Sequence, residues 1–324
     1  MSDPTPAAAD PHQSADSQAI EPGMTVSGLA GPDSTMTDAL LDASVPHCAR
    51  VYAYLLGTKD HFEADRDVAR EMMRHRPQAA AAARANRAFG RRATIYAAQA
   101  RGIGQFLDIG TGLPAPDATH QVAHQARRGS HVAYVDNDPV VMAHARALLT
   151  PGTAALGTCD YIAADVRDPA ALLAKAAAVL DFTEPVAVWL LAVLHFLPDF
   201  DDPAGIVAAL AAALAPGSLI AISHLTDDLA PGPVTAAIAA YNARMPSPVY
   251  PRSHDEVRGL FGGLPLQWPG VVPVTQWRPA FQEAPGSRTC DIYGGLAVIP
   301  PAGAQPQPGV ATGPAPAADE RAAS

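Results

Sequence analysis

Residues 106–114, FLDIGTGLP, decide the fold class of this chain. An apolar strand pattern containing Asp108 runs directly into a turn that holds Gly110 and Gly112. Glycine permits positive φ and lets a ligand approach the backbone closely, and such a turn presents backbone N–H groups at the carboxyl edge of a sheet. The stretch therefore predicts the first strand and the ligand-binding turn of an α/β domain, although GTGLPA also fits the relaxed dinucleotide fingerprint.

Downstream of this turn, short apolar runs alternate with helical patterns. Strands are predicted over residues 104–110, 130–136, 158–165, 185–196 and 217–225, with helices over 119–128, 138–149, 168–180 and 204–215. Strands spaced in this way need crossover connections, which predicts a parallel sheet with helices on both faces. Two late strands, 271–277 and 293–300, have no full helix between them. We therefore expect one of them to enter the sheet antiparallel.

Upstream of the sheet, the pattern of residues 38–101 is helical. Asp60 and Glu63 form a capping-box signature for a helix over 60–76. The buried face predicted for this helix holds Phe62, Ala69, Met72 and Met73. A second, Ala-rich helix is predicted after Pro77, and one stripe on it consists of Arg84, Arg87 and Arg91. We interpret that stripe as a solvated face rather than an anion site.

The charge of the chain is concentrated at its ends. The 324 residues carry a formal charge of −10, yet residues 1–36 hold five acidic residues and no basic ones. Both 1–36 and the Pro/Ala-rich 301–324 have too few large apolar residues to offset the entropy of ordering, so both are predicted to be disordered tails. Between them we expect a helical cover over 37–101 and a ligand-binding domain over 102–300. That body is near neutral, which makes nucleic acid an improbable partner.

Cysteine usage and the apolar runs narrow the class of protein further. Cys48, Cys159 and Cys290 are far apart and predict neither a disulfide framework nor a zinc or other metal site. The opening MSDPTPAAADPHQSAD lacks the basic and apolar parts of a signal peptide. A Pro-Gly pair splits the uncharged residues 203–226 into pieces too short to cross a bilayer. We expect a cytoplasmic protein without membrane contact, of an oligomeric state that the sequence does not indicate.

Acidic residues also stand at the ends of the second and third predicted strands. Asp136 lies 26 residues after Gly110, where a carboxylate can accept hydrogen bonds from a ribose diol. Asp138 fits the N-cap of the following helix better than Asp136 does. Asp165 could accept from an adenine amino group, but Asp165 or Asp168 could equally serve only as a helix cap.

Three acidic strand ends in succession, the first beside a glycine turn, resemble class I S-adenosylmethionine-dependent methyltransferases. The segments CARVYAYLLGTKDHFEADR, ARANRAF, FLDIGTGLP, YVDNDPVVMAHARALL and AVLHFLPD, in this order, resemble an S-adenosyl-methyltransferase family of actinobacteria whose substrates are largely unassigned. The resemblance covers about residues 37–300. It implies a Rossmann-like seven-stranded α/β sheet whose last strand is antiparallel, with an N-terminal helical cover. The turn departs from the pattern in having Leu113 and Pro114 where a third glycine is usual.

The resemblance also implies which residues contact S-adenosylmethionine. Asp108 and the backbone of Gly110, Thr111 and Gly112 would face its methionine end, Asp136 with Asn137 its ribose, and Asp165 with Val166 its adenine. The end of the fourth strand, including Ala192 and Leu194, would line the methyl-donating sulfonium. Methyl-acceptor contacts are expected from the cover, namely Tyr52, Tyr54, Lys59, Asn86 and Arg87.

Two histidines follow buried strands at the expected ligand edge. His195 could act as a general base for the methyl acceptor, or it could form a wall that positions the substrate. We favour the wall, because no acceptor is known whose proton would need removal. His224, at the end of the fifth strand, is a weaker candidate for either role.

The sequence therefore predicts a methyltransferase that moves a methyl group from S-adenosylmethionine to an unidentified acceptor, most simply a small molecule. Two alternatives stay open. GTGLPA with Asp136 also suits an NAD(P)-dependent oxidoreductase, and a non-catalytic regulatory module could bind the same cofactor. An antiparallel final strand would favour the methyltransferase over the oxidoreductase.

Overall fold

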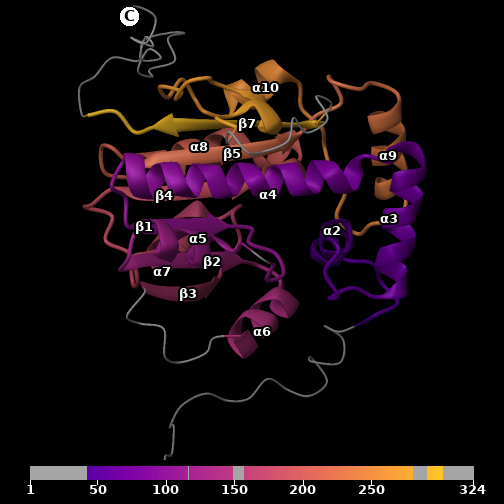
Figure 1. Cartoon of the computed structure of the whole chain (residues 1–324), viewed down its shortest axis with the longest axis horizontal. Helices are drawn as coiled ribbons and strands as arrows, with labels where there is room; N and C mark the ends of the chain where they lie inside the picture. The colour runs from indigo at the N-terminus through magenta and orange to yellow at the C-terminus, as the bar shows by residue number, and fades with distance from the viewer. Residues whose placement is uncertain (1–41, 116, 149–156, 280–289, 302–324) are drawn as a thin grey trace, which may run out of the picture. The chain divides into compact units, whose positions relative to one another are not determined.

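The computed structural model describes residues 42–115, 117–148, 157–279 and 290–301. Their strands form one seven-stranded sheet in the order β3-β2-β1-β4-β5-β7-β6 (Figure 1). The strands are β1 Gln105–Ile109, β2 Ser130–Asp136, β3 Gly157–Ala163, β4 Val186–Leu191, β5 Leu219–Leu225, β6 Val272–Pro273 and β7 Ile292–Val298. Strands β1 to β5 pair in parallel, whereas β7 pairs antiparallel with β5. The predicted mixed sheet with a late antiparallel strand is confirmed.

The second late strand is much shorter than predicted. Only Val272–Pro273 pair with β7, and a 3-10 turn, η4 Val274–Gln276, follows at once. Pro273 has no N–H to give to a ladder, which confines it to the edge of the sheet. The predicted strand over 271–277 is therefore mostly turn.

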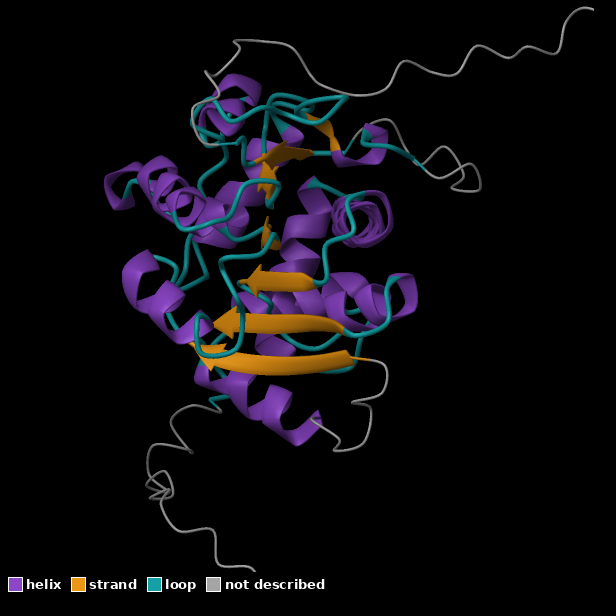
Figure 2. Ribbon diagram, turned by 90° about the vertical axis from the view of Figure 1, so that its left-hand side faces the viewer, coloured by secondary structure: helices purple, strands orange, loops and turns teal. Residues whose placement is uncertain are grey.

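Helices cover both faces of the sheet, as the crossover pattern predicts (Figure 2). They are α2 Cys48–Leu56, α3 Glu63–His75, α4 Ala79–Ile95, α5 Thr119–Ala126, α6 Pro139–Leu148, α7 Pro169–Ala176, α8 Pro203–Ala212, α9 Pro233–Asn242 and α10 His254–Gly259. Helices α4 and α5 contribute to one apolar core, and α7, α8 and α10 to the other. β4 is buried on both faces, with Trp189 in one core and Leu190 in the other. This explains the continuous apolar run that its sequence shows.

A third apolar cluster joins α2, α3, α9 and the first turns of α4, and we call these elements the helical cover. Figure 1 shows α2, α3 and α9 beside one end of the sheet, while α4 runs across its face. Val51, Val68 and Tyr241 are among the buried residues of the cover. The contribution of α9 makes the cover larger than the predicted segment 37–101.

The entrance to α3 differs from the predicted capping box. The helix begins at Glu63, after an N-cap at Phe62, so Asp60 does not cap it. Phe62 is 41% exposed and does not belong to the core, whereas Ala69 of the same predicted face is fully buried. The N-cap N–H is instead satisfied by Asp65, whose carboxylate accepts from the Phe62 N–H at 2.8 Å.

Asp65 is the polar centre of the cover. Its buried carboxylate accepts from the Phe62 N–H, from the His47 N–H at 2.8 Å and from Arg50 Nε at 2.8 Å. The Arg50 side chain is itself only 6% exposed. Every oxygen of this buried ion is thus hydrogen-bonded, as burial of a charge requires.

The predicted tails lie outside the described residues, except for Pro301. Among the described helices, none combines the length and apolar character needed to cross a membrane.

We expect Asp65→Ala to lower the free energy of unfolding by about 3–5 kcal/mol, because it leaves Arg50 buried without its anion. Asp67→Ala is the matched control, since Asp67 lies on the same helix with its side chain 45% exposed. Urea denaturation of both variants checks the difference, and equal midpoints would contradict it.

Candidate functional site

The glycine turn after β1 fits between the ends of the two neighbouring strands. The N–H groups of Gly110 and Thr111 donate to the Val135 carbonyl of β2 at 2.8 and 3.3 Å. Gly110 has φ +73°, and a Cβ there would lie 2.5 Å from Cγ2 of Val193, which follows β4. Both the left-handed backbone and the close approach exclude a side chain. The turn therefore needs glycine at this position.

Asp136 holds the other end of the turn. Its carboxylate accepts from the Gly112 N–H and from the Asp138 N–H, each at 2.9 Å. Burial is the main influence on this carboxyl and raises its pKa. A carboxylate offers about four acceptor sites, so two remain for a ligand in the cavity that Asp136 lines. Asp138 caps α6 by accepting from the Val140 N–H at 2.8 Å, as predicted.

Asp165 is bound more completely by its neighbours. It accepts from the backbone N–H and Nε of Arg167 at 2.9 and 3.0 Å, from Nη2 of Arg167 at 2.5 Å and from Nδ2 of Asn137 at 2.9 Å. The hydrogen bonds from Arg167 are the main reason that the pKa of Asp165 is lowered to about 2. An adenine amino group would have to displace part of this set. Asp168 is the residue that caps α7, accepting from the Ala171 N–H at 3.0 Å.

Asp108 is buried at the end of β1 and lines the same cavity. Its carboxylate accepts from the Thr119 hydroxyl at 2.6 Å. Burial raises the pKa of Asp108 to about 6, against the opposing influence of the Thr119 hydrogen bond and of the Arg87 guanidinium. Near neutral pH the site thus holds a carboxyl close to its titration point.

The loop after β4 begins with a strained residue. Ala192 has φ +57°, a conformation that costs a non-glycine residue about 1–2 kcal/mol. Its N–H is held by the Ser223 carbonyl at 3.1 Å and the Ser223 hydroxyl at 3.0 Å. Ala192 lines the cavity, as predicted, but Leu194 is fully buried in the sheet core and is absent from the lining. The expectation that Leu194 contacts the cofactor is not supported.

His195 lines the cavity, and its Nδ1 atom is buried without a hydrogen-bond partner among the described residues. Burial lowers the pKa of this imidazole well below its ordinary value, and the neighbouring His224 and Arg252 lower it further. The ring is therefore neutral at physiological pH.

His224 has a structural role. Its Nδ1 lies 2.7 Å from the Leu225 carbonyl and its Nε2 lies 2.9 Å from Nη1 of Arg252, so Nδ1 carries the proton and Nε2 accepts. Arg252 also donates to the carbonyls of Leu194 and Leu197 at 3.1 and 2.9 Å. Arg252 thus fixes the backbone on both sides of His195, and His224 helps to orient Arg252.

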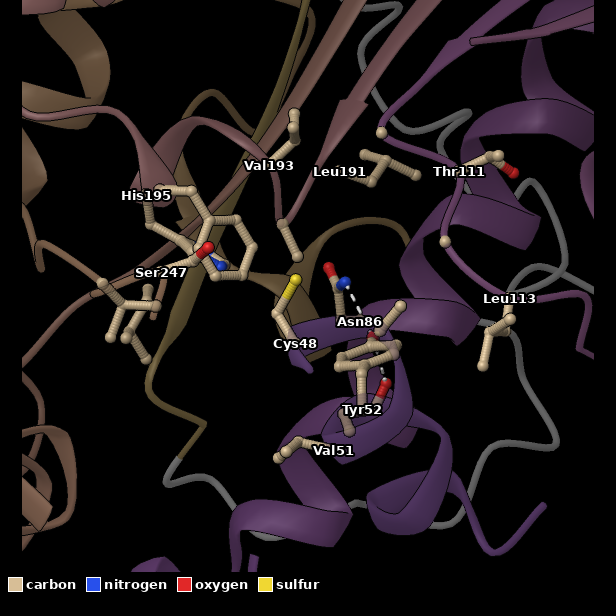
Figure 3. Close-up of a pocket in the computed structure, with 18 of the residues that line it drawn as sticks. Cys48, Val51, Tyr52, Asn86, Thr111, Leu113, Leu191, Val193, His195 and Ser247 are labelled. Atoms are coloured by element: carbon tan, nitrogen blue, oxygen red, sulfur yellow. Dashed lines mark hydrogen bonds between the residues drawn. The ribbon is translucent and has the colours of Figure 1, made fainter. Parts of the chain in front are cut away.

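These elements enclose a cavity of about 600 Å³ between the strand ends and the helical cover. Figure 3 shows His195 and Val193 from the sheet side and Cys48, Val51, Tyr52 and Asn86 from the cover side. The volume is in the range of small-molecule sites. All the predicted cofactor residues except Leu194 line it, namely Asp108, Gly110, Thr111, Gly112, Asp136, Asn137, Asp165, Val166 and Ala192.

The predicted acceptor contacts divide into two groups. Tyr52, Asn86 and Arg87 line the cavity. Arg87 is half-buried there, so the solvated-face interpretation of the arginine stripe is wrong for it, whereas Arg84 and Arg91 are exposed and Arg91 also borders the cavity. Tyr54 and Lys59 do not line it. Tyr54 packs edge-on against His61, and Lys59 is exposed.

Several lining residues have no signal in the sequence pattern. His47 caps α2, and its Nε2 lies 2.8 Å from Asp138, which joins the cover to the loop after β2. Cys48 lies beside it, and burial with the nearby Asp136 and Asp138 raises the pKa of its thiol to about 12. That thiol stays protonated. Only the tertiary fold brings these residues to the strand ends.

The strand order, the antiparallel β7, the glycine turn and the acidic strand ends together define a class I type of methyltransferase site. The chain belongs to the S-adenosyl methyltransferase family, whose sequence pattern matches residues 34–300. It is a methyltransferase, and its cofactor is S-adenosylmethionine. The antiparallel β7 also favours this class over the oxidoreductase.

Two solved structures from actinobacteria are similar over nearly their whole length. A protein from Streptomyces avermitilis shares 38% identity, with a TM-score of 0.74 over 80% of this chain and 99% of that one. A protein from Thermobifida fusca, named as a candidate methyltransferase, shares 34% identity, with a TM-score of 0.72 over 81% and 97%. No curated protein sequence matches the chain.

The site fits the cofactor in two respects. The turn at Gly110 leaves its backbone without a side chain at the cavity wall, and Asp136 keeps free acceptor sites facing a cavity of adequate volume.

We expect Asp136→Ala to weaken S-adenosylmethionine binding by about 1.5–3 kcal/mol, the range for a lost hydrogen bond to a charged group. Calorimetry measures the change, and NAD should give no binding to either form. Asp160→Ala is the control, because Asp160 pairs with His131 at 2.6 Å outside the cavity. Unchanged affinity in a folded Asp136→Ala variant would remove Asp136 from the site.

Proposed function

We propose that the chain transfers the methyl group of S-adenosylmethionine to a small molecule held beneath the helical cover. The observation that carries this proposal is the single cavity shared by the strand ends and the cover. One wall carries the glycine turn and Asp136, and the opposite wall is mostly apolar with a few polar side chains from α2 and α4. Enclosed, largely apolar sites of this kind suit small molecules.

The cofactor contacts in this proposal are those that the resemblance to the family implies, and the lining of the cavity supports them. Asp136 holds the ribose, and Asp108 with the Gly110–Gly112 backbone holds the methionine end. Asp165 with Val166 holds the adenine, whose amino group displaces one of the donors now bound to Asp165. When bound, S-adenosylmethionine supplies a methyl group: the acceptor's lone pair forms a bond to the methyl carbon as the carbon–sulfur bond breaks, and the sulfur leaves as a neutral thioether. The chain itself orients the reactants, and in-line positioning alone can supply roughly 7–11 kcal/mol of the barrier.

His195 positions the acceptor rather than removing its proton. A general base is most effective when its pKa lies near the working pH, and the pKa of this buried imidazole lies well below that range. Its backbone is fixed by Arg252 and by the Tyr250 N–H, which donates to the His195 carbonyl at 2.8 Å. A neutral ring in a fixed place is suited to forming a wall.

The acceptor class is tested with S-adenosylmethionine carrying an isotopically labelled methyl group. We expect label in the low-molecular-weight fraction of a bacterial extract, and none in the protein or RNA fractions, because the volume of the cavity and its largely apolar lining suit a small molecule. Heat-denatured enzyme is the control. Label confined to a macromolecular fraction would overturn the small-molecule assignment.

Once the acceptor is identified, we expect His195→Ala to raise the KM for the acceptor while kcat and cofactor affinity stay nearly unchanged. His131→Ala is the comparison, since His131 pairs with Asp160 outside the cavity and its loss should leave KM and kcat unchanged. A His195→Ala enzyme that binds both ligands normally but turns over about a thousandfold more slowly would identify a general base instead.

A further inference from the structure

Asn86 presents an unsatisfied hydrogen-bond acceptor to the cavity. The residue lies on α4, is only 3% exposed and lines the cavity wall. Its Nδ2 donates to the Tyr52 hydroxyl at 3.1 Å, while its Oδ1 is buried with no partner among the described residues. Leaving a buried polar atom unpaired costs about 1–3 kcal/mol, so such an atom in a binding cavity points to a ligand that pairs with it.

The orientation of the amide follows from the hydroxyl beside it. Tyr52 has one hydroxyl proton, which it donates to the Ala83 carbonyl at 3.2 Å. The hydroxyl can therefore only accept from Asn86, and the NH2 group must face it. Figure 3 shows the Asn86 oxygen on the side of the amide away from Tyr52. The atom offered to the ligand is thus an acceptor and not a donor.

The place of Asn86 along α4 sets which ligand it meets. One turn later, a Cβ at Gly90 would lie 2.8 Å from Cδ1 of Leu191, so α4 touches the last residue of β4 there. Asn86 lies one turn, about 6 Å, back along the helix axis toward the cover, and it lines the same cavity as Ala192 and Val193 of the loop that follows β4. Arg87, about 100° around the helix, points instead to the loop after β1, where it donates to the Asp117 carbonyl at 3.1 Å.

We propose that Asn86 is a positioning residue whose Oδ1 accepts a hydrogen bond from an O–H or N–H group of the methyl acceptor. The inference rests on the proposed small-molecule function and narrows it to hydroxyl- or N–H-bearing substrates. A carboxylate without a proton has nothing to donate to this atom. Of the arginines that line the cavity, Arg76 is held by Asp291 through two contacts of 2.9 and 3.2 Å, and Arg87 donates to the Asp117 carbonyl.

The experiment uses paired probes in which a methyl group replaces the donor hydrogen: phenol against anisole, and indole against 1-methylindole. Their affinities are measured by NMR titration of the full chain saturated with S-adenosylhomocysteine. For the wild type we expect the O–H or N–H member of each pair to bind about tenfold more tightly. Asn86→Leu is similar in size but has no acceptor, so we expect both members of each pair to bind this variant about equally.

Two variants serve as controls. Tyr52→Phe removes the hydroxyl that fixes the orientation of the amide, so the preference for the donor should weaken although the Asn86 oxygen remains. Asn86→Asp keeps an acceptor in either orientation and should retain the preference, and its comparison with Asn86→Ala replaces Asn86→Leu if that variant does not fold. S-adenosylmethionine affinity should be the same in all folded variants.

The outcomes separate this inference from the proposed function. Equal affinities within each pair in the wild type, or no binding of any probe, would overturn it. A tenfold loss of S-adenosylmethionine affinity in Asn86→Leu would assign the oxygen to the cofactor and overturn it too, while leaving methyl transfer intact. Failure to label any small molecule, with the donor preference preserved, would instead contradict the proposed function.

Discussion

The narrow space after β1 constrains the whole site. Because β1 lies between β2 and β4, its turn must pass between their ends, bound to the Val135 carbonyl on one side and against Val193 on the other. Only a glycine in the left-handed region fits there. This brings the backbone after β1 and the loop after β4 together, and the cavity opens over their junction.

Three buried or half-buried carboxylates surround this junction, and each is stabilised differently. Asp136 accepts from backbone N–H groups of the turn it supports, and Asp108 accepts from a hydroxyl at the start of α5. Asp165 is held by the Arg167 guanidinium and by Asn137. The differences appear in their acidity, since burial raises the pKa of Asp108 to about 6 and Arg167 lowers that of Asp165 to about 2. Similar positions at strand ends therefore do not imply similar chemistry.

The sheet and the strand-end residues could be predicted because their signals are local. Apolar runs separated by helical patterns determine a parallel sheet, and the carboxyl ends of its strands then meet at one edge. Contacts between distant segments had no such signal. Arg252, which fixes the loop around His195, and His47, which meets Asp138, come from segments whose patterns show only helix ends or loop. Leu194 was misplaced because a residue directly after a strand can turn either to the ligand or to the core.

Helix α4 belongs to two cores at once. Its first turns, with Ala79 and Ala83, pack in the cover, while Phe89 and Ala93 pack on the sheet. The part of α4 that lines the cavity is therefore continuous with the part that packs on the sheet. Ala82, between Ala79 and Ala83, already belongs to the core on the sheet, so the two cores meet within the first turns of the helix. In the proposed function, the contact with the methyl acceptor and the anchoring on the sheet therefore lie in neighbouring turns of one helix.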